Sequence, residues 1–390
     1  MKSFDIETYG ARPDGTTLNT RAIQTAIDEC HEDGGGVVSC GPGRFLTGSI
    51  ELKCGVELHL GHGCSLVAST DIRHYDDFEA PGFHGAKAPE RSTKSLVRAI
   101  GANDVAITGP GEINGSGLAF YDTGNRSGRF FRKPDNERPR MVMMYECTDI
   151  RIEGASFVDS PCWTFWLMKC ERIGIRGARV RGDQRMINND GIDIDSCRDV
   201  TISDCLLKTG DDCLILRAID NMFEKPEPCE RVTVTNCVLD SWCQGIRLGC
   251  PGDGTIRNAT FSNIVIESAN NGILIEHPKR YLPEGDTGSA DMHDLRFSGF
   301  VINCAGAPIR ANVEEGIALK RLSDISFSDM RIVSGQPCRI EGSSQTTIRD
   351  VSLSDIDIDC SGEDAVVFRR CRGVVLDRVR LAHNPDREDD

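Results

Sequence analysis

Aromatic residues are scarce in this sequence: Trp, Tyr and Phe together make up only 6% of the 390 residues. Basic side chains are also outnumbered, with 45 Lys and Arg against 60 Asp and Glu, which gives a formal net charge of -15 at pH 7. A chain this acidic repels phosphate backbones and anionic lipid, so we expect neither nucleic acid nor a membrane as a partner. An acidic polymer would need a local basic groove.

Long hydrophobic runs are missing as well. No segment approaches the roughly 18 apolar residues of a membrane span, and residues 1–7 lack the apolar stretch of a secretory signal. We therefore expect a cytoplasmic protein. Linkers and low-complexity segments are absent too, which predicts a single domain over residues 1–390. We divide it into a cap region 1–45, repeated coils 46–382 and a polar tail 383–390.

A strand-like repeat runs through most of the chain. Apolar residues recur at positions i, i+2 and i+5, as in Ile150, Ile152 and Ala155. The copies begin at Ile150, Ile173, Val200, Val232, Ala259, Leu295, Ile325, Val351 and Val374. The i, i+2 spacing is that of a strand, and the irregular period, from 23 to 36 residues, indicates loops of different lengths between regular coils.

Such a pattern is buried well in a parallel β-solenoid. Each coil stacks its apolar residues on the next one, about 4.8 Å away. A β-sandwich, with strands every 8 to 12 residues or so, predicts no period of this length. The sequence therefore predicts an all-β solenoid, in which many of the 18 cysteines, such as Cys205 and Cys237, are small buried thiols. Cys243 and Cys250 lack a second close pair with zinc spacing, so we predict no metal site and no cofactor.

One helix is expected near the start of the chain. Apolar residues stand at positions 22, 23, 26, 27 and 30, after Asn19-Thr20 and before Gly34-Gly35-Gly36. We expect this helix to cap the open end of the solenoid and to protect its sheet edge.

Three carboxylates stand one coil apart in Asn188-Asn189-Asp190 and Gly210-Asp211-Asp212. An inverting sugar hydrolase needs two carboxyl groups about 6.5 to 9.5 Å apart, one as acid and one as base. Packing like charges closely raises one pKa, which helps to keep an acid protonated near neutrality. The spacing of Asp190, Asp211 and Asp212 therefore predicts the catalytic residues of a glycosidase.

Further motifs follow a recognisable order along the chain. They are Tyr9-Gly10-Ala11, Gly41-Pro42-Gly43, Gly109-Pro110-Gly111-Glu112-Ile113-Asn114-Gly115, Ser160-Pro161-Cys162-Trp163, Asn188-Asn189-Asp190-Gly191 and Gly210-Asp211-Asp212-Cys213. In this order they resemble the polygalacturonase family of glycoside hydrolases, family 28. The resemblance implies a right-handed parallel β-helix with a substrate groove along one face. It also implies inverting hydrolysis of a pectin-related or other plant-type poly- or oligosaccharide, in which Asp212 protonates the leaving oxygen while Asp190 and Asp211 activate water.

The coils can be aligned by stacking Ile192, Leu214, Ile246 and Ile273. The flanking positions then form three columns, which are Asp190, Asp212, Gln244 and Asn271; Asp193, Ile215, Arg247 and Leu274; and Asp195, Arg217, Gly249 and Glu276. From these columns and their neighbours we take six candidate substrate-binding residues, which are Gln244, Arg247, Glu276, Arg217, Trp242 and His277. Asp193 and Asp195 alternate with isoleucines and are expected on a solvated strand face.

The chain departs from the family at two places. The family has a His in Gly-His-Gly where this chain has Cys243-Gln244-Gly245, and an Arg-Ile-Lys that grips the galacturonate carboxylate where it has Leu274-Ile275-Glu276. Glu276 would repel a uronate by about a kcal/mol or more in a partly desolvated groove. Three explanations stay open. The substrate is a neutral or differently substituted sugar, or Arg247 holds a carboxylate at a shifted subsite, or catalysis has been lost.

Two insertions, Leu118 to Arg140 and Asp220 to Cys229, are too long for ordinary coil turns. We expect them to wall off one end of the groove, which suggests exo action on oligosaccharides. A β-helix can also be a polysaccharide lyase, or an inactive carbohydrate-binding or structural protein. Three carboxylates in adjacent coils favour the hydrolase over these alternatives.

Overall fold

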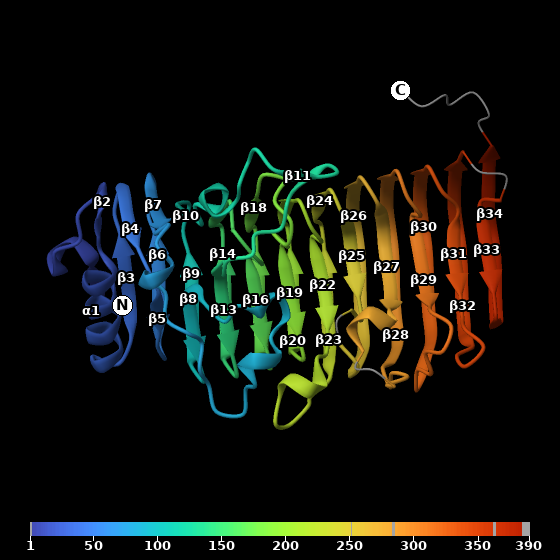
Figure 1. Cartoon of the computed structure of the whole chain (residues 1–390), viewed down its shortest axis with the longest axis horizontal. Coiled ribbons are helices and arrows are strands. Elements are labelled where there is room, and N and C mark those ends of the chain that lie inside the picture. Colours follow the sequence, from blue (N-terminus) through green and yellow to red (C-terminus); the bar gives the residue numbers. More distant parts are fainter. Residues whose placement is uncertain (1, 251, 283–284, 362–363, 384–390) are drawn as a thin grey trace.

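The strands of this computed structural model follow one another along a single long axis, with the N-terminal and C-terminal coils at opposite ends (Figure 1). The structure describes residues 2–250, 252–282, 285–361 and 364–383. Successive strands pair in parallel on every face of the coil, so the fold is a parallel β-helix, as the repeat predicted.

One face of the helix is an 11-stranded parallel sheet, here called the groove face. Its strands are β5 Ile50–Leu52, β8 Ser95–Ile100, β13 Arg140–Tyr145, β16 Phe165–Met168, β19 Ile192–Asp195, β22 Leu214–Arg217, β25 Gln244–Leu248, β27 Asn271–His277, β29 Ile309–Val313, β31 Cys338–Glu341 and β33 Val366–Arg369. The candidate acids immediately precede β19 and β22, at the middle of this sheet.

The other strands belong to a 21-stranded sheet that forms the remaining two faces. The first of these faces consists of β1 Ser3–Asp5, β3 Gly36–Cys40, β6 Val56–Leu60, β9 Asn103–Thr108, β14 Thr148–Glu153, β17 Glu171–Arg176, β20 Arg198–Ser203 and β23 Cys229–Thr235. The second consists of β2 Asp14–Leu18, β4 Gly43–Thr47, β7 Cys64–Ala68, β10 Glu112–Asn114, β15 Ser156–Val158, β18 Arg179–Arg181, β21 Leu206–Thr209 and β24 Val238–Ser241. The two faces merge in the long strands β26 Thr255–Ser268, β28 Asp291–Cys304, β30 Arg321–Ser334, β32 Ile348–Cys360 and β34 Cys371–His383.

The interior of the coil is a stack of aliphatic side chains in register. Ile192 pairs with Leu214, Leu214 with Ile246, and Ile246 with Ile273, which confirms the predicted alignment of coils. Every cysteine is buried except Cys54, Cys243 and Cys371, so thiols fill positions of the same stack.

Helix α1 spans Thr20–Glu32, close to the predicted bounds. It buries Ile23, Ala26, Ile27 and Cys30 against the first coils, at the N-terminal end of the molecule (Figure 1). The remaining helices are short 3-10 turns at η1 Ile6–Tyr9, η2 Ile72–His74, η3 Gly85–Lys87, η4 Pro89–Arg91, η5 Gly117–Phe120, η6 Asp220–Met222 and η7 Lys279–Tyr281. Among the described residues, no helix has the length and apolarity needed to cross a bilayer.

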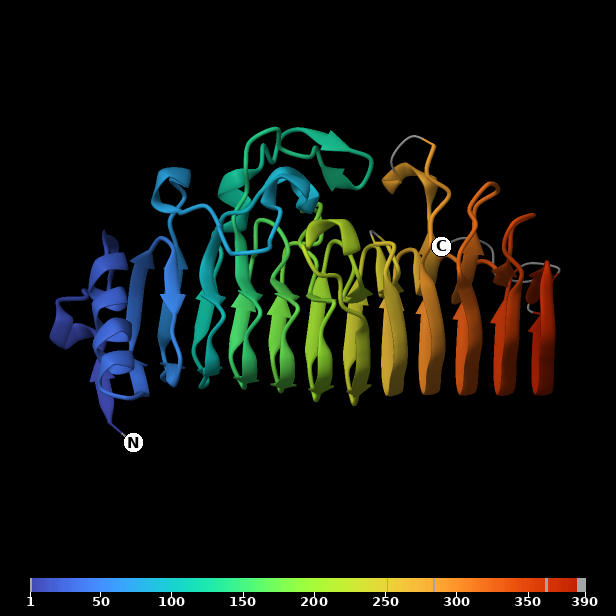
Figure 2. The same cartoon turned by 90° about the horizontal axis from the view of Figure 1, so that it is seen from below.

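Long loops stand over the groove face, on one side of the coil stack (Figure 2). They are residues 69–94, 115–139, 218–228 and 278–290, and the second carries the hairpin of β11 Arg126–Ser127 and β12 Phe130–Phe131. The insertions predicted at 118–140 and 220–229 are among them. The predicted polar tail lies outside the described residues from position 384 onward.

A second hydrophobic cluster lies outside the coil, on the outer side of β13 and β16. It consists of Phe78, Phe83, Ala88, Met143, Tyr145, Cys162, Trp163, Trp166, Met168, Ile219, Met222 and Phe223. We call it the outer cluster. It ties the loops 69–94 and 218–228 to the groove face, and Phe83 and Phe223 form an antiparallel bridge between these two loops.

Candidate active site

The three candidate carboxylates occupy two stacked turns. Asp190 stands two residues before β19, and Asp211 and Asp212 stand just before β22. The Gly191 amide donates to the Asp212 carbonyl at 2.9 Å, which holds the two turns in parallel register. Stacking of adjacent coils thus brings all three acids to one corner of the groove face.

Asn189 fastens the second turn to the first. Its Oδ1 accepts hydrogen bonds from the amides of Gly210 (2.6 Å) and Asp211 (3.2 Å), and its Nδ2 donates to the Asp183 carbonyl (3.1 Å). Position 210 has no room for a side chain, because a Cβ there would lie 2.4 Å from the Met186 carbonyl oxygen. The Asn-Asn-Asp and Gly-Asp-Asp motifs therefore form one interlocked unit.

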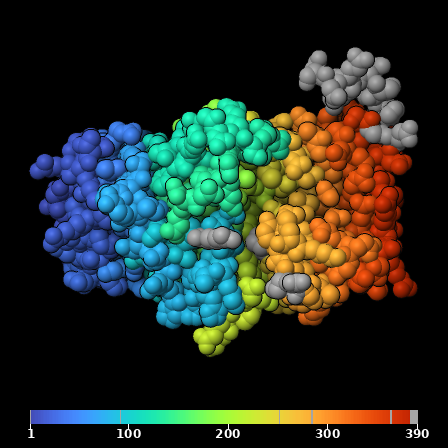
Figure 3. All heavy atoms as spheres, in the orientation of Figure 1, coloured from blue at the N-terminus to red at the C-terminus, as the bar shows by residue number. Residues whose placement is uncertain are grey.

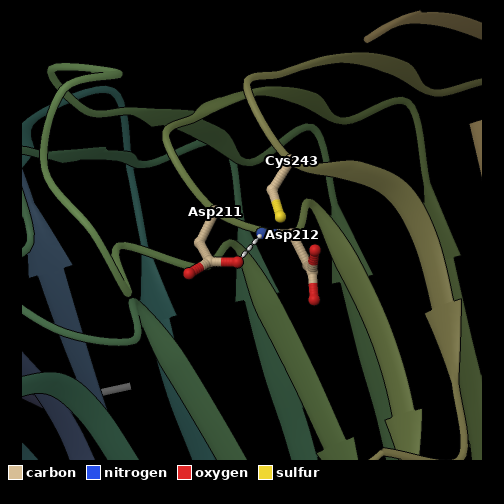
Figure 4. A group of neighbouring side chains, drawn as sticks. All are labelled: Asp211, Asp212 and Cys243. Carbon is tan, nitrogen blue, oxygen red and sulfur yellow. Dashed lines mark hydrogen bonds between the residues drawn. The ribbon is translucent and has the colours of Figure 1, made fainter. Parts of the chain in front are cut away.

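Asp211 is the one acid of the three that remains partly exposed. Its Oδ1 accepts from the Asp212 amide at 3.1 Å (Figure 4), and its Oδ2 accepts from the Asn188 amide at 3.1 Å. Asn188 presents that amide from a left-handed backbone conformation, with φ of 62°. Burial of the carboxyl and the negative charge of Asp212 raise the pKa of Asp211 to about 6. Half of such carboxyls hold a proton at that pH.

Asp212 is fully buried, and both of its carboxylate oxygens accept hydrogen bonds. The backbone amide of Gln244 donates to Oδ1 at 3.1 Å, and Arg247 Nη1 donates to Oδ2 at 3.0 Å. Arg247 Nη2 in turn contacts Glu276 Oε1 at 2.5 Å, and Arg280 Nη2 lies 3.3 Å from the same oxygen. Burial lowers the pKa of Arg247, but the anions of Asp212 and Glu276 outweigh it and raise the pKa. Arg247 is thus a charged bridge between two carboxylates.

Asp190 is 3% exposed, and its Oδ1 lacks a hydrogen-bond partner in the described part of the chain. Burial and the charges of Asp211, Asp193 and Asp212 raise the pKa of Asp190, whereas Arg217 lowers it. Arg217 is 1% exposed, so it does not offer its guanidinium to the groove in the way expected of a substrate-binding residue.

The predicted solvent exposure of Asp193 and Asp195 is wrong, because both are 0% exposed. Asp195 accepts hydrogen bonds from Trp166 Nε1 at 3.3 Å and from the Ile219 amide at 3.1 Å, and burial raises its pKa to about 6. The outer cluster covers this part of the sheet. The sequence signal that could have revealed it is the pair Trp163 and Trp166, two rings of a scarce residue type three positions apart.

Two other predicted residues flank the acids. Gln244 is 5% exposed, and its Oε1 accepts from Asn271 Nδ2 at 2.8 Å, its neighbour in the next coil. Trp242 is partly exposed at the edge of the groove, where its ring lies 6.1 Å from the Phe130 ring of the loop 115–139. Its carbonyl accepts from Arg129 Nη2 of the same loop.

His277 lines a recess of about 560 Å³ between the loops 69–94, 218–228 and 278–290. None of the three candidate acids lines it. The surface is hollowed between these loops and the loop 115–139 (Figure 3). Four carboxyl residues line the recess, Glu90, Asp220, Asp253 and Asp286, against one lysine, Lys87. His277 Nε2 lies 3.2 Å from Asp253 Oδ1, while burial and the acids around it raise the pKa of Asp220 to about 6. Glu90 is neutralised by Lys133 and Arg138.

Among the described residues, one trio has potential metal-ligand atoms within 4.8 Å of one another: Asp211, Asp212 and Cys243 (Figure 4). The carboxylates of this trio already accept the protein hydrogen bonds given above. Their close approach is explained by the stacked turns, and we assign no metal to them.

The family model described as "Glycosyl hydrolases family 28" matches residues 68–374. A "Probable polygalacturonase" of Vitis vinifera is 28% identical over 284 residues, which is 70% of this chain but only 57% of that protein. An "Exopolygalacturonase" of Zea mays is 23% identical over 98% of this chain and 84% of its own length. Among solved structures, a hyperthermoactive exopolygalacturonase from Thermotoga maritima superposes with a TM-score of 0.79 at 22% identity, over 97% of this chain and 91% of that one.

Proposed function

The chain belongs to family 28 of the glycosyl hydrolases, and from this premise we propose that it hydrolyses a glycosidic bond at Asp190, Asp211 and Asp212 with inversion of configuration. The observation that carries the proposal is the interlocked pair of turns, which gathers three carboxyls with different partners at one corner of the groove face. A structural or purely binding protein gains nothing from burying like charges together.

The contacts of the three acids suggest how their roles divide. Arg247 donates directly to Asp212, and Arg217 lies 3.9 Å from Asp190. Asp211 accepts from the backbone amides of Asn188 and Asp212 and from the Asn188 side chain, and the Cys243 thiol lies beside it. Both carboxylate oxygens of Asp212 already accept hydrogen bonds, from Arg247 and from the Gln244 backbone, which suits this residue to accept rather than to donate. Asp190 is 3% exposed, and burial and the neighbouring acids raise its pKa well above the usual value despite Arg217. Asp211, partly exposed and with a pKa of about 6, is suited to carry the proton. We therefore assign the acid role to Asp211 rather than to Asp212, which the family resemblance had suggested.

The proposed reaction is a single displacement. Asp190, with Asp212, accepts a proton from a water molecule as the water oxygen attacks the anomeric carbon. The bond from that carbon to the glycosidic oxygen breaks, and Asp211 gives its proton to the departing oxygen. One water is consumed, the anomeric centre inverts, and the proton returns through solvent to Asp211.

We propose that the sugar bound beside the acids is neutral or carries a substituent other than a free carboxylate. Arg247, the cation best placed to hold a uronate, is already shared between Asp212 and Glu276. Leu274 is 3% exposed and offers no charge, and the recess lined by His277 contains more carboxyls than cations. A uronate there would meet repulsion of about a kcal/mol or more. A pectin side chain or backbone rich in neutral sugars suits this environment.

We also propose that the enzyme acts from a chain end. The outer cluster and the loops it anchors cover β13 and β16, and β16 pairs with β19, the strand after Asp190. A polymer therefore cannot lie along the whole groove face on that side of the acids. The relatives from Zea mays and Thermotoga maritima are named as exo enzymes, which supports the same mode of action.

The decisive experiment measures reducing sugar and product size from polygalacturonate, rhamnogalacturonan, arabinan and neutral pectic oligosaccharides. We expect the highest kcat/KM on a substrate with neutral sugars, one product size from the first minutes, and an inverted anomer by NMR. Polygalacturonate as the best substrate would favour a shifted carboxylate site at Arg247 instead. Release from none of the substrates would favour the inactive binding protein.

A further inference from the structure

Arg217 stands near Asp190, at the end of the strand that follows Asp212. It is the last residue of β22 and stands opposite Asp195 in the adjacent coil. Its side chain projects from the outer side of the groove face, yet only 1% of the residue is exposed. A residue this buried contacts Asp190 and Asp193 inside the protein and is shielded from a sugar in the groove.

The guanidinium of Arg217 contacts two carboxyls and one ring. Its Nη2 lies 2.5 Å from Asp193 Oδ1 and 3.9 Å from Asp190 Oδ2, and its central carbon lies 4.2 Å from the centre of the Trp163 ring. Nε and Nη1 lack hydrogen-bond partners in the described part of the chain, as does Asp190 Oδ1. Arg217 thus has two donors, and Asp190 one acceptor, without a hydrogen-bond partner among the described residues.

The groups that surround Asp190 are otherwise anionic. Asp193 lies in β19, the strand that follows Asp190, and Asp211 and Asp212 lie in the turn before β22. Arg217 is the cation that acts against these three charges and against burial. Together these groups leave the pKa of Asp190 well above its usual value. Asp190 must be ionised to take a proton from water, and Arg217 is the neighbour whose charge favours that form.

We propose that Arg217 is a positioning residue that favours the ionised form of Asp190 and orients it as the base for the attacking water. The inference rests on the proposed function of Asp190. Trp163 fixes the guanidinium by a cation–π contact, and Asp193 fixes its far end, so the arginine cannot swing into the groove. Arg217 acts through Asp190 and touches no substrate.

The test compares Arg217→Gln and Arg217→Lys with a matched control at Arg140. Arg140 is also fully buried and also stacks on Trp163, at 4.7 Å, but its Nη2 donates to the Pro89 carbonyl at 2.6 Å. In the described part of the chain, the ion pair of Asp190 is with Arg217 and not with Arg140. In Arg217→Gln we expect the acidic limb of kcat/KM against pH to move up by about one unit, a tenfold loss at low pH that shrinks as the pH rises. Arg217→Lys should restore most of the limb. Arg140→Gln should leave the limb where it is in wild type.

An acidic limb that stays in place in Arg217→Gln, with a loss equal at every pH, would overturn the proposal in favour of a packing role. A second readout does not need activity and separates this inference from the proposed function. The unfolding temperature is measured against pH with and without Arg217→Gln in three backgrounds, which are wild type, Asp190→Asn and Asp193→Asn. We expect the effect of Arg217→Gln on this pH dependence to be clearly smaller in the Asp190→Asn background than in wild type. Removal by Asp193→Asn alone would show that Arg217 serves only Asp193, whether or not the protein hydrolyses the sugars offered.

Discussion

Arg247 Nη1 lies 3.0 Å from Asp212 Oδ2, although the two residues belong to different columns of neighbouring coils. The register places Arg247 beside Ile215, one strand position after the apolar stack, while Asp212 lies before it. The long side chain of the arginine therefore runs diagonally back toward the turn. Asp212 thus has a direct hydrogen bond from Arg247, whereas Asp211 feels this arginine only through its charge, so the environments of the acids differ.

Arg247→Met removes the charge from this contact while keeping an unbranched side chain. Asp212 has a side chain 1% exposed, so losing its partner leaves an unpaired buried charge. We expect the free energy of unfolding to fall by about 3 kcal/mol, measured by urea denaturation at pH 7. Arg280→Met is the control, since Arg280 is mostly exposed and contacts the same Glu276, and it should cost no more than about 0.5 kcal/mol. Equal losses in the two variants would contradict a special role for the Asp212 contact.

The assignment of the acid is tested by leaving groups. If Asp211 donates the proton, Asp211→Asn should lower kcat/KM by about two orders of magnitude or more on a natural oligosaccharide. It should lower it much less on a nitrophenyl glycoside, whose leaving group needs no proton. Asp190→Asn and Asp212→Asn should lose similar factors on both substrates. If Asp212→Asn instead shows the leaving-group dependence, the roles of the two neighbouring aspartates are exchanged.

Stability should depend on pH through the buried acids. The pKa of Asp211 is raised to about 6 in the folded protein, against about 3.9 in an unfolded chain. The folded state therefore binds this proton more tightly, so its contribution to stability is full below about pH 4 and is lost as the pH rises through about 6. Asp195, also raised to about 6, adds to the same trend.

We expect the unfolding temperature to fall between pH 5 and pH 7 in scanning calorimetry, and Asp211→Asn to make that fall smaller. The exposed Asp377 provides a control, because Asp377→Asn should leave the slope of wild type intact. An unfolding temperature that rises over this range in the wild-type protein would contradict raised pKa values for these acids in the folded state.

The sequence predicted the coils and their register because one aliphatic stack, from Ile192 to Ile273, dictates both. The positions of Asp190 and Asp212 followed from that stack. What lies above the sheet did not, since the loops 69–94 and 218–228 have no period. Their packing with Trp166 covers Asp195, and Asp193 is buried against Arg217. The bridge from Arg247 to Asp212 was also hidden, because a column fixes where a Cα lies and not how far a long side chain reaches.

Glu276→Gln tests the discrimination against acidic sugars. The amide keeps the size of the side chain and can still accept from Arg247, but it removes a charge that faces the groove beside Arg280. Losing about one kcal/mol of repulsion should raise kcat/KM on polygalacturonate about fivefold, while values on neutral oligosaccharides stay level or fall slightly. Glu153→Gln, on the exposed surface of β14 and away from the groove face, is the matched control and should change neither value. The decisive quantity is the ratio of kcat/KM on polygalacturonate to kcat/KM on the neutral oligosaccharide, measured by initial rates at several salt concentrations. Because added salt screens repulsion, it should shrink the difference in this ratio between Glu276→Gln and wild type. A ratio that does not move would place a bound uronate beyond the reach of Glu276.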